Sequence, residues 1–273
     1  MKIATRCVCC GSIRLDPSPS VLMPFIAHRI FGWVPIKITK EWGLRTIPEG
    51  TTYVPCNSLF CRDCGLSFLD MRFDDEEMQR LYSDYRGNEY LAMRLQYEPD
   101  YQDRNDRRVA GCEYMPVVEE FLRPHLRFPV SILDYGGDTG LNAPFINHRT
   151  TLHVYDIGNK PVLDGVAKDT SSLDARYDLI FCSNVLEHVS YPIKVLHDIT
   201  TRMDVDTVLY IEVPAEEKKR FWHEHVNRFT EKSLNKLFEH CGMSGVRMRT
   251  VVVDQQEGAA HQIQAQVMLA NKG

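Results

Sequence analysis

The chain of 273 residues is long enough for one large domain and a smaller one, and its composition is that of an ordinary globular protein. Its formal net charge of −5 gives no overall attraction for nucleic acid or anionic membranes. No uninterrupted apolar stretch approaches the about 20 residues of a membrane span, and the N-terminus has no signal-peptide core. We therefore expect a cytoplasmic protein.

Two Cys-x-x-Cys-Gly units are the first motif along the chain, and they pair Cys7 with Cys10 and Cys61 with Cys64. Each unit can fold around a metal so that both thiolates point at it, and two units complete a tetrahedral zinc site. A redox dithiol is the main alternative, which the second pair disfavours. A closed site of four thiolates has no open position for chemistry, so we expect structural zinc to stabilise a small lobe over residues 1–70.

The segments that follow each cysteine pair carry no catalytic motif. Residues 17–55 are rich in proline and aromatic residues, which predicts irregular strands and loops that fill out the zinc lobe. Residues 71–125 predict a helical linker or lid, with a helix capped by Asp74 and Glu77 and another over 109–122. This region contains Tyr82, Tyr85, Tyr90, Tyr97 and Tyr101. We favour half-buried linker helices; the alternative is an aromatic lid over a cationic ligand.

The segment 130–140 reads Val-Ser-Ile-Leu-Asp-Tyr-Gly-Gly-Asp-Thr-Gly. An apolar run too short for a helix ends at Asp134, glycines follow, and Pro144 stands where a helix could begin its first turn. The pattern predicts a strand, a tight turn and a helix start. The glycines of this turn are Gly136, Gly137 and Gly140. They permit positive φ and let a ligand approach the backbone.

The acidic residues of this turn indicate what kind of ligand it would bind. A dinucleotide loop holds a pyrophosphate against amide groups, and Asp134 and Asp138 would repel that anion. The carboxylates favour a ligand with a cationic or hydroxyl-rich part. A glycine-rich turn without any ligand is the alternative interpretation.

A second acid supports a nucleoside ligand. The strand over 151–155 ends at Asp156, which lies 20 residues after Gly136. An acid at the carboxyl end of the next parallel strand can bind a ribose diol, and we assign Asp156 and Ile157 to the cofactor site. NAD enzymes share this position, so it does not choose between the two cofactors. The alternative is a solvent-exposed loop aspartate that binds no ligand.

The later segments continue the alternation of strands and helices. Buried strands are predicted over 177–182 and 207–213, and the segment 246–269 predicts two closing strands. Helices are predicted from Pro192 and after Thr230, which has an N-cap side chain.

His223, Glu224 and His225 lie on the loop that follows a predicted strand, where open α/β sheets place their sites. The two histidines are not spaced as in a zinc protease helix, but alternation in an extended loop can place both imidazoles on one side. A histidine there can remove a hydroxyl proton, and Glu224 can fix its tautomer. The alternative is a pair of structural histidines that tie the loop to the sheet.

The pattern Asp134-x-Gly136-x-Asp138-x-Gly140 resembles motif I of the class I S-adenosylmethionine (SAM) methyltransferases. The segment from Asp178-Leu179-Ile180 to Val185-Leu186-Glu187-His188-Val189 closely resembles a second stretch of that family. The resemblance implies an α/β, Rossmann-like sheet of seven strands over 126–273, ending in an antiparallel hairpin, with SAM as cofactor. It also implies that Asp169 contacts the adenine amino group, that Asn184 lines the methionine part, and that His188 is structural.

The cysteine units, motif I and His-Glu-His-x-x-x-Phe-Thr together resemble sugar methyltransferases with an N-terminal zinc-binding domain. In these a tyrosine commonly precedes His-Glu-His, whereas Trp222 stands here, and C-methylating members continue beyond the closing hairpin. We therefore expect methylation of a sugar hydroxyl in a nucleotide-sugar or surface-glycan precursor. The alternatives are C-methylation of a keto-sugar, RNA methylation in which the zinc lobe binds the RNA, and a non-enzymatic zinc-stapled interaction module.

Overall fold

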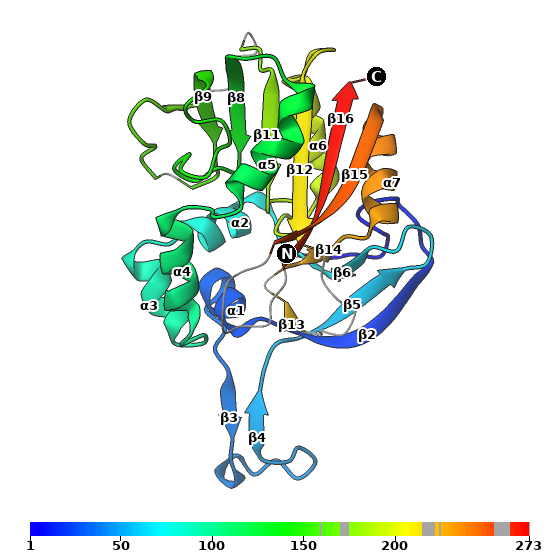
Figure 1. Cartoon of the computed structure of the whole chain (residues 1–273). Helices are drawn as coiled ribbons and strands as arrows, with labels where there is room; N and C mark the ends of the chain where they lie inside the picture. The colour runs from blue at the N-terminus through cyan, green and yellow to red at the C-terminus, as the bar shows by residue number, and fades with distance from the viewer. Residues whose placement is uncertain (159, 170–174, 215–221, 224, 254–262, 273) are drawn as a thin grey trace.

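The computed structural model describes residues 1–158, 160–169, 175–214, 222–223, 225–253 and 263–272. Its centre is a seven-stranded sheet in the upper half of Figure 1. In spatial order the strands are β10 (Ala167–Lys168), β9 (Arg149–Tyr155), β8 (Val130–Tyr135), β11 (Leu179–Ser183), β12 (Val208–Pro214), β16 (Ile263–Lys272) and β15 (Met243–Val253). The first five are parallel, and β16 runs antiparallel to both β12 and β15. The predicted α/β fold and closing hairpin are confirmed.

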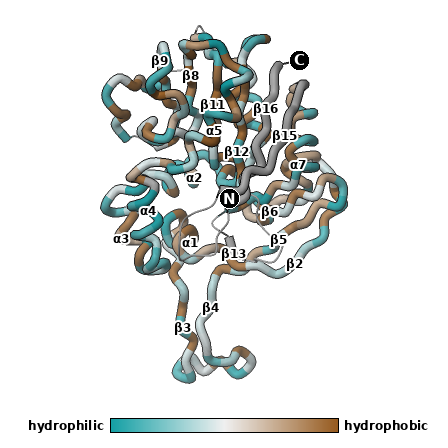
Figure 2. Tube along the Cα trace, viewed as in Figure 1, coloured by the Kyte–Doolittle hydropathy of each residue, from teal (hydrophilic) through white to brown (hydrophobic). Residues whose placement is uncertain are grey.

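Both faces of the sheet are covered, because its central strands are mostly apolar and are buried along nearly their whole length (Figure 2). Helix α5 (Met115–Leu122) packs on the face that carries Ile132 and Phe181. Helices α6 (Pro192–Thr201) and α7 (Glu231–His240) pack on the opposite face. Successive strand side chains point to opposite faces, so the carboxyl end of each strand presents one side chain toward each layer.

Two helices begin where the capping residues predicted. Helix α2 (Asp75–Tyr82) starts after Asp74, whose carboxylate accepts the Glu77 amide at 3.0 Å while the Glu77 carboxylate accepts the Asp74 amide at 2.9 Å. Helix α7 starts after Thr230, whose hydroxyl accepts the Ser233 amide at 3.2 Å. Each cap satisfies a backbone donor that the first helical turn leaves without a partner.

Three expected elements are different in the structure. No helix follows Gly140, because residues 141–147 form turns that lead to β9. The helix expected over 109–122 is two helices, α4 (Tyr101–Ala110) and α5, because Gly111 takes φ of 112° between them. The segment expected to contain only strands and loops includes helix α1 (Pro24–Phe31).

The N-terminal half forms a second sheet and a helical group, seen in the lower half of Figure 1. The second sheet has the order β13 (Trp222–His223), β2 (Leu15–Leu22), β5 (Pro55–Cys61), β6 (Ser67–Leu69) and β14 (Asn227–Arg228). The remaining elements of this half are β1 (Lys2–Ile3), β7 (Met71–Arg72), helix α3 (Asn88–Leu95) and the short 3-10 helix Lys40–Trp42, while the 3-10 helix Arg123–His125 follows α5. Helices α1 to α4 pack around a separate core that includes Phe25, Tyr90 and Tyr101.

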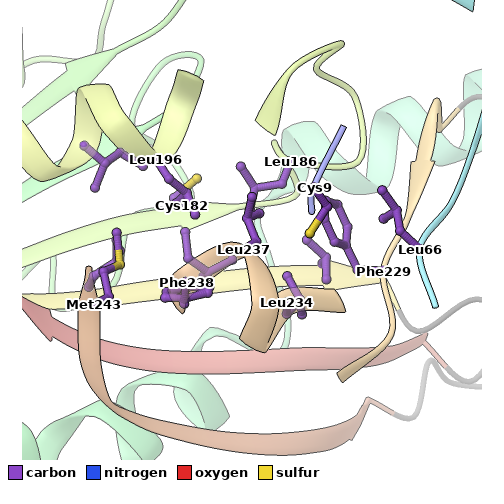
Figure 3. Packing of buried hydrophobic residues seen from close by; sticks show 14 of the residues in the cluster. Cys9, Leu66, Cys182, Leu186, Leu196, Phe229, Leu234, Leu237, Phe238 and Met243 are labelled. Atoms are coloured by element: carbon purple, nitrogen blue, oxygen red, sulfur yellow. The ribbon is translucent and has the colours of Figure 1, made fainter. Parts of the chain in front are cut away.

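The two halves share strands and core. Strands β13 and β14 come from the segment that contains the His-Glu-His motif, yet they pair with β2 and β6 of the N-terminal sheet. The thiol of Cys9 donates to the Ser233 carbonyl of α7 at 3.0 Å. Cys9 and Leu66 also belong to the same hydrophobic cluster as Leu234 (Figure 3). The predicted domain boundary at residue 70 stays a prediction. The N-terminal sheet takes two strands from beyond it, and one hydrophobic cluster contains residues from both sides.

A hairpin of β3 (Ile36–Ile38) and β4 (Gly50–Thr52) extends away from the rest of the molecule (Figure 1). It carries exposed large apolar side chains, including Ile36 and Trp42. The residues here were expected to fill out the zinc lobe, and the projecting hairpin is a departure from that expectation.

The buried guanidinium of Arg72 joins the N-terminal half to the loop after β11 and to the segment just before β14. Its exposed fraction is 1%, and burial lowers its pKa to about 10, so it stays protonated at neutral pH. All five N–H donors are used, at 2.6 to 3.0 Å, on Leu69 O, Met71 O, Ser190 O, Val226 O and Asn227 Oδ1. The Asn227 side-chain amide in turn donates to Leu186 O and Val189 O at 2.8 and 2.6 Å.

We expect Arg72→Met to lower the free energy of unfolding by at least about 3 kcal/mol, because it leaves buried carbonyls without donors. Urea denaturation followed by circular dichroism measures this loss. Arg62→Ala is the control, since Arg62 pairs with Asp16 on the surface and its removal should cost no more than about 1 kcal/mol. Equal losses in the two variants would contradict the role given to Arg72.

Candidate functional site

The glycine-rich turn after β8 is packed so tightly that side chains would not fit. Gly136 has φ of 82°, its amide donates to Tyr155 O at 2.6 Å, and an added Cβ would lie 2.4 Å from Val185 Cγ2. An added Cβ on Gly137 would lie 2.2 Å from the Asp134 carboxylate. Gly140 has φ of 84°. The backbone of the turn therefore lies directly against the ends of β8 and β9, as the glycines predicted.

Three carboxylates gather around this turn. Asp134 at the end of β8 is 4% exposed. Asp156, after β9, accepts the Asp138 amide at 2.9 Å and the Gly158 amide at 2.6 Å, which fixes the turn against the neighbouring loop. Lys160 Nζ lies 3.3 Å from the Asp138 carboxylate. The structure thus brings the predicted acids Asp134, Asp138 and Asp156 together at the carboxyl edge of the parallel sheet.

The concentration of negative charge makes Asp134 hard to ionise. Burial raises its pKa to about 7, and the nearby charges of Asp156 and Asp138 add to that effect. Burial also raises the pKa of Asp156, partly offset by the two backbone amides that it accepts. A cation bound here would relieve the repulsion and favour the ionised form of Asp134.

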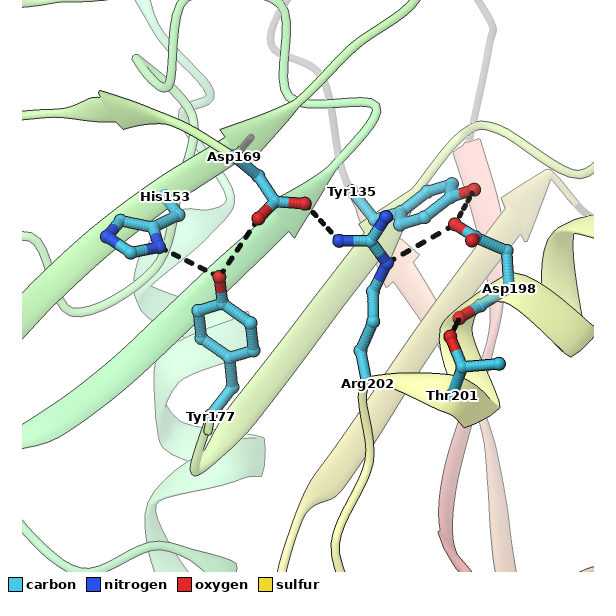
Figure 4. A network of polar contacts seen from close by, with 7 residues as sticks. All are labelled: Tyr135, His153, Asp169, Tyr177, Asp198, Thr201 and Arg202. Atoms are coloured by element: carbon cyan, nitrogen blue, oxygen red, sulfur yellow. Dashed lines mark hydrogen bonds and ion pairs between the residues drawn. The ribbon is translucent and has the colours of Figure 1, made fainter. Parts of the chain in front are cut away.

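Asp169 is at the end of β10, where its amide donates to Val154 O at 2.8 Å. Its carboxylate, 3% exposed, pairs with Arg202, and its other oxygen accepts Tyr177 Oη at 3.4 Å (Figure 4). Arg202 also pairs with Asp198. The carboxylate predicted to contact adenine therefore holds a side-chain network on the outer part of the sheet, and a role toward adenine stays a prediction.

The remaining predicted cofactor residues lie along the same edge. Ile157 is 49% exposed beside Asp156. Asn184, with φ of 55°, donates its amide to Glu212 O at 2.9 Å and its side-chain amide to Ser183 Oγ at 2.9 Å. The sequence did not single out Glu212, which is 1% exposed at the end of β12. Its carboxylate accepts hydroxyls of Tyr114, Ser183 and Tyr210 at 2.7 to 3.0 Å.

The loop that follows β11 meets the His-Glu-His segment. The ring centroids of His188 and His225 are 4.7 Å apart and nearly perpendicular. Glu187, 2% exposed, lies beside them, and its Oε1 is 3.8 Å from His188 Nε2. His223 lies in β13 with its side chain outside the described part, and Glu224 lies outside the described residues. The sequence assigned His188 only a structural role, since contact with His225 depends on the tertiary fold.

The end of α2 connects this histidine pair to the acidic turn. The ring of Tyr82 lies 6.4 Å from that of His188, and its carbonyl oxygen would be 3.9 Å from a Cβ added to Gly158. Tyr85 lies under Lys160, whose Nζ is 5.7 Å from the ring centroid. By contrast, Tyr90 and Tyr101 are buried in the helical core. Tyr82 and Tyr85 thus lie beside the candidate site and also pack against the helical core, as the linker interpretation expected, while a lid over the ligand stays a prediction.

The four predicted metal ligands converge in the N-terminal half. The sulfur atoms of Cys7 and Cys64 are 3.6 Å apart, as are those of Cys10 and Cys61, and all four lie within 4.8 Å of one another. Sulfurs around one zinc ion at about 2.3 Å lie roughly 3.8 Å apart, so the arrangement fits a tetrahedral thiolate site. Cys9 is not a member of this group, and its thiol donates a hydrogen bond to the Ser233 carbonyl oxygen.

Comparison with known proteins gives the class of the enzyme. A family model described as "Methyltransferase domain" matches residues 101–247, more than half of the chain. The chain belongs to this family. It is a class I SAM-dependent methyltransferase, as the resemblance of motif I and of the segment 178–189 implied.

Solved structures are similar to this methyltransferase at low sequence identity. The 1,6-didemethyltoxoflavin N1-methyltransferase of Burkholderia thailandensis, solved with its substrate and S-adenosylhomocysteine, is 18% identical over 78% of this chain and 96% of its own, with a TM-score of 0.51. SAM-dependent methyltransferases of Archaeoglobus fulgidus and Aquifex aeolicus are 16% and 17% identical. They cover 58% and 57% of this chain and 94% and 89% of their own, with TM-scores of 0.40 and 0.41. No curated protein matches the chain. Within the described residues, no helix is both long and apolar enough to cross a membrane.

We expect the affinity of the methyltransferase for SAM to fall about tenfold between pH 8 and pH 6. Asp134 with a pKa of about 7 is protonated at the lower pH, and a cationic ligand favours the ionised form, so proton binding competes with the ligand. Calorimetric titration at both pH values measures the change. Asp134→Asn should bind SAM weakly with no such dependence, while Asp164→Asn, at an exposed loop position, should keep it. Equal pH profiles for wild type and Asp134→Asn would contradict the assignment.

Proposed function

We propose that this methyltransferase transfers the methyl group of SAM to a hydroxyl of a sugar in a nucleotide-sugar or surface-glycan precursor. The observation that carries the proposal is the common edge shared by the acidic turn and the histidine pair, with the end of α2 against both. Open α/β sheets bind their ligands at the carboxyl ends of the strands. The sugar class is supported by the resemblance of the four cysteines and the His-Glu-His segment to sugar methyltransferases.

The acidic turn would bind the cofactor. Asp156 would accept the ribose hydroxyls, and Asp134 with Asp138 would attract the ammonium group. Gly136, Gly137 and Gly140 let the backbone of this turn pack closely against Val185, Asp134 and Val154, where an added side chain would be crowded. We assign Ile157, Asp169 and Asn184 to the same site. SAM, when bound, supplies an activated methyl group on a sulfonium, so the protein contributes mainly positioning and deprotonation.

A histidine of the His-Glu-His segment would accept the hydroxyl proton of the acceptor. His225 is the better placed of the described residues, because it is half-buried and its ring lies against His188 beside the catalytic edge. A neutral imidazole can take the proton as the acceptor oxygen attacks the methyl carbon, and the neighbouring groups hold its orientation. His223 and Glu224 remain candidates for the base and for its orienting carboxylate.

The proposal is tested by methyl transfer from labelled SAM to panels of nucleotide sugars, lipid-linked glycans, keto-sugars and mixed RNA. We expect transfer to a sugar hydroxyl, and a 10²- to 10⁴-fold lower kcat in His225→Ala, in line with removal of a general base. SAM affinity should stay within about twofold, since the acid turn is unchanged. His240→Ala, at an exposed position on α7, should keep the full rate.

Two results would refute parts of the proposal separately. Transfer only to a carbon acceptor or to RNA would overturn the acceptor class and leave the enzyme class intact. Full rates in both His223→Ala and His225→Ala would overturn the base. Absence of SAM binding would support the zinc-stapled interaction module.

We also propose that the four-cysteine site holds a structural zinc ion. Its thiolates come from the two turns that flank the N-terminal sheet, and Cys61 and Cys64 are buried beside the core shared with α7. A bound ion would tie the N-terminal sheet to that core, so its binding energy would contribute to folding. Elemental analysis should find one zinc ion per chain, and Cys64→Ser should lose the ion together with several degrees of Tm. A zinc-free protein of unchanged Tm would contradict this site.

A further inference from the structure

The group formed by Glu187, His188 and His225 has the composition of a metal site. Each residue offers one ligand atom, and these atoms all lie within 4.8 Å of one another. Two imidazoles and a carboxylate form a donor set typical of divalent transition ions. The three residues are distinct from the four cysteines, and neither the family match nor the sequence motifs assign a metal to them.

The spacing of the group fits an ion held between its three members. Glu187 Oε1 and His188 Nε2 are 3.8 Å apart, which is beyond hydrogen-bond distance. Ligand atoms around one ion at about 2.0 to 2.2 Å lie roughly 3 to 4 Å apart, so small side-chain rotations bring all three atoms into range. The carboxylate is buried and the two rings are half-buried, so the group offers one negative charge to a cation and remains reachable from solvent.

The backbone at these ligands is held rigidly. The carbonyl oxygen of Glu187 accepts the Asn227 amide at 3.0 Å, and the Asn227 side chain binds the carbonyls on either side of the Glu187–His188 pair. Arg72 binds Val226 O, next to His225, at 2.8 Å. Each ligand is thus within two residues of a buried hydrogen bond, and such support is what positions metal ligands in proteins.

We propose that Glu187, His188 and His225 bind a divalent transition ion at the catalytic edge of the methyltransferase. Three protein ligands would leave at least one position of the ion open. The ring of Tyr82 lies 6.4 Å from that of His188. The inference rests on the proposed function for its consequence: an acceptor hydroxyl oxygen would take the open position, and the ion would lower the pKa of that hydroxyl. With the ion bound, His225 would be a ligand instead of the base, and the hydroxyl proton would leave to solvent.

The site is tested by titrating the full-length protein, with its cysteine site saturated with zinc, with Co(II) as the probe. Histidine and carboxylate ligands produce visible d–d absorption without the thiolate charge-transfer bands that cysteine ligands would add. We expect one equivalent of Co(II) with the first kind of spectrum. His188→Ala and His225→Ala should lose it, and Glu187→Gln, which keeps the side-chain size, should weaken binding at least about tenfold by removing the only charge. His240→Ala should retain wild-type binding.

Circular dichroism and SAM titration show that each variant is folded before Co(II) binding is compared. Wild type without a second ion site, or His188→Ala and His225→Ala with undiminished Co(II) binding, would overturn the inference and leave a group joined only by hydrogen bonds and ring packing. A protein that binds Co(II) at these residues but methylates no sugar would keep the inference and refute the proposed acceptor. A protein that methylates sugars and binds no Co(II) there would refute the inference and keep the proposed acceptor.

Discussion

The hydrogen bonds of Arg72 and Asn227 are the constraint on which the arrangement of this methyltransferase depends. Arg72 belongs to the N-terminal half, whereas the carbonyls of Ser190 and Val226 belong to two loops of the catalytic half. A buried guanidinium is stable only when every N–H has an acceptor, and here all five do. The requirement fixes both loops relative to one another, and with them His188 and His225.

The same constraint explains why the N-terminal half is part of the enzyme's working structure. The segment with the His-Glu-His motif leaves the central sheet, adds β13 and β14 to the N-terminal sheet, and returns to α7. The four cysteines lie in the core that α7 also uses. Through these contacts a zinc ion held by the four cysteines would support the position of His225. This is a structural role, consistent with four thiolates that leave no coordination site open.

The acidic turn after β8 contains electrostatic interactions that are unfavourable in the absence of a ligand. Asp134, Asp138 and Asp156 repel one another, and burial adds to the cost of ionising Asp134. Tight glycines prevent the backbone from relaxing, because added side chains would collide with Val185 or Asp134 itself. A cationic nucleoside relieves this repulsion, which a pyrophosphate would increase. Charge therefore accounts for the choice of cofactor class where glycine spacing alone, shared with dinucleotide loops, does not.

The sequence by itself determined the sheet, the glycine turn with its acids, the caps at Asp74 and Thr230, and the four converging cysteines, because these depend on local periodicity, backbone freedom and ligand spacing. It predicted wrongly a helix after Gly140, where the chain forms turns, and a helix through Gly111, whose φ of 112° separates α4 from α5. Only the tertiary structure decided that Glu187 and His188 meet His225, and that Glu212 receives three hydroxyls. Those contacts join segments far apart in the chain, and no local pattern carries information about such meetings.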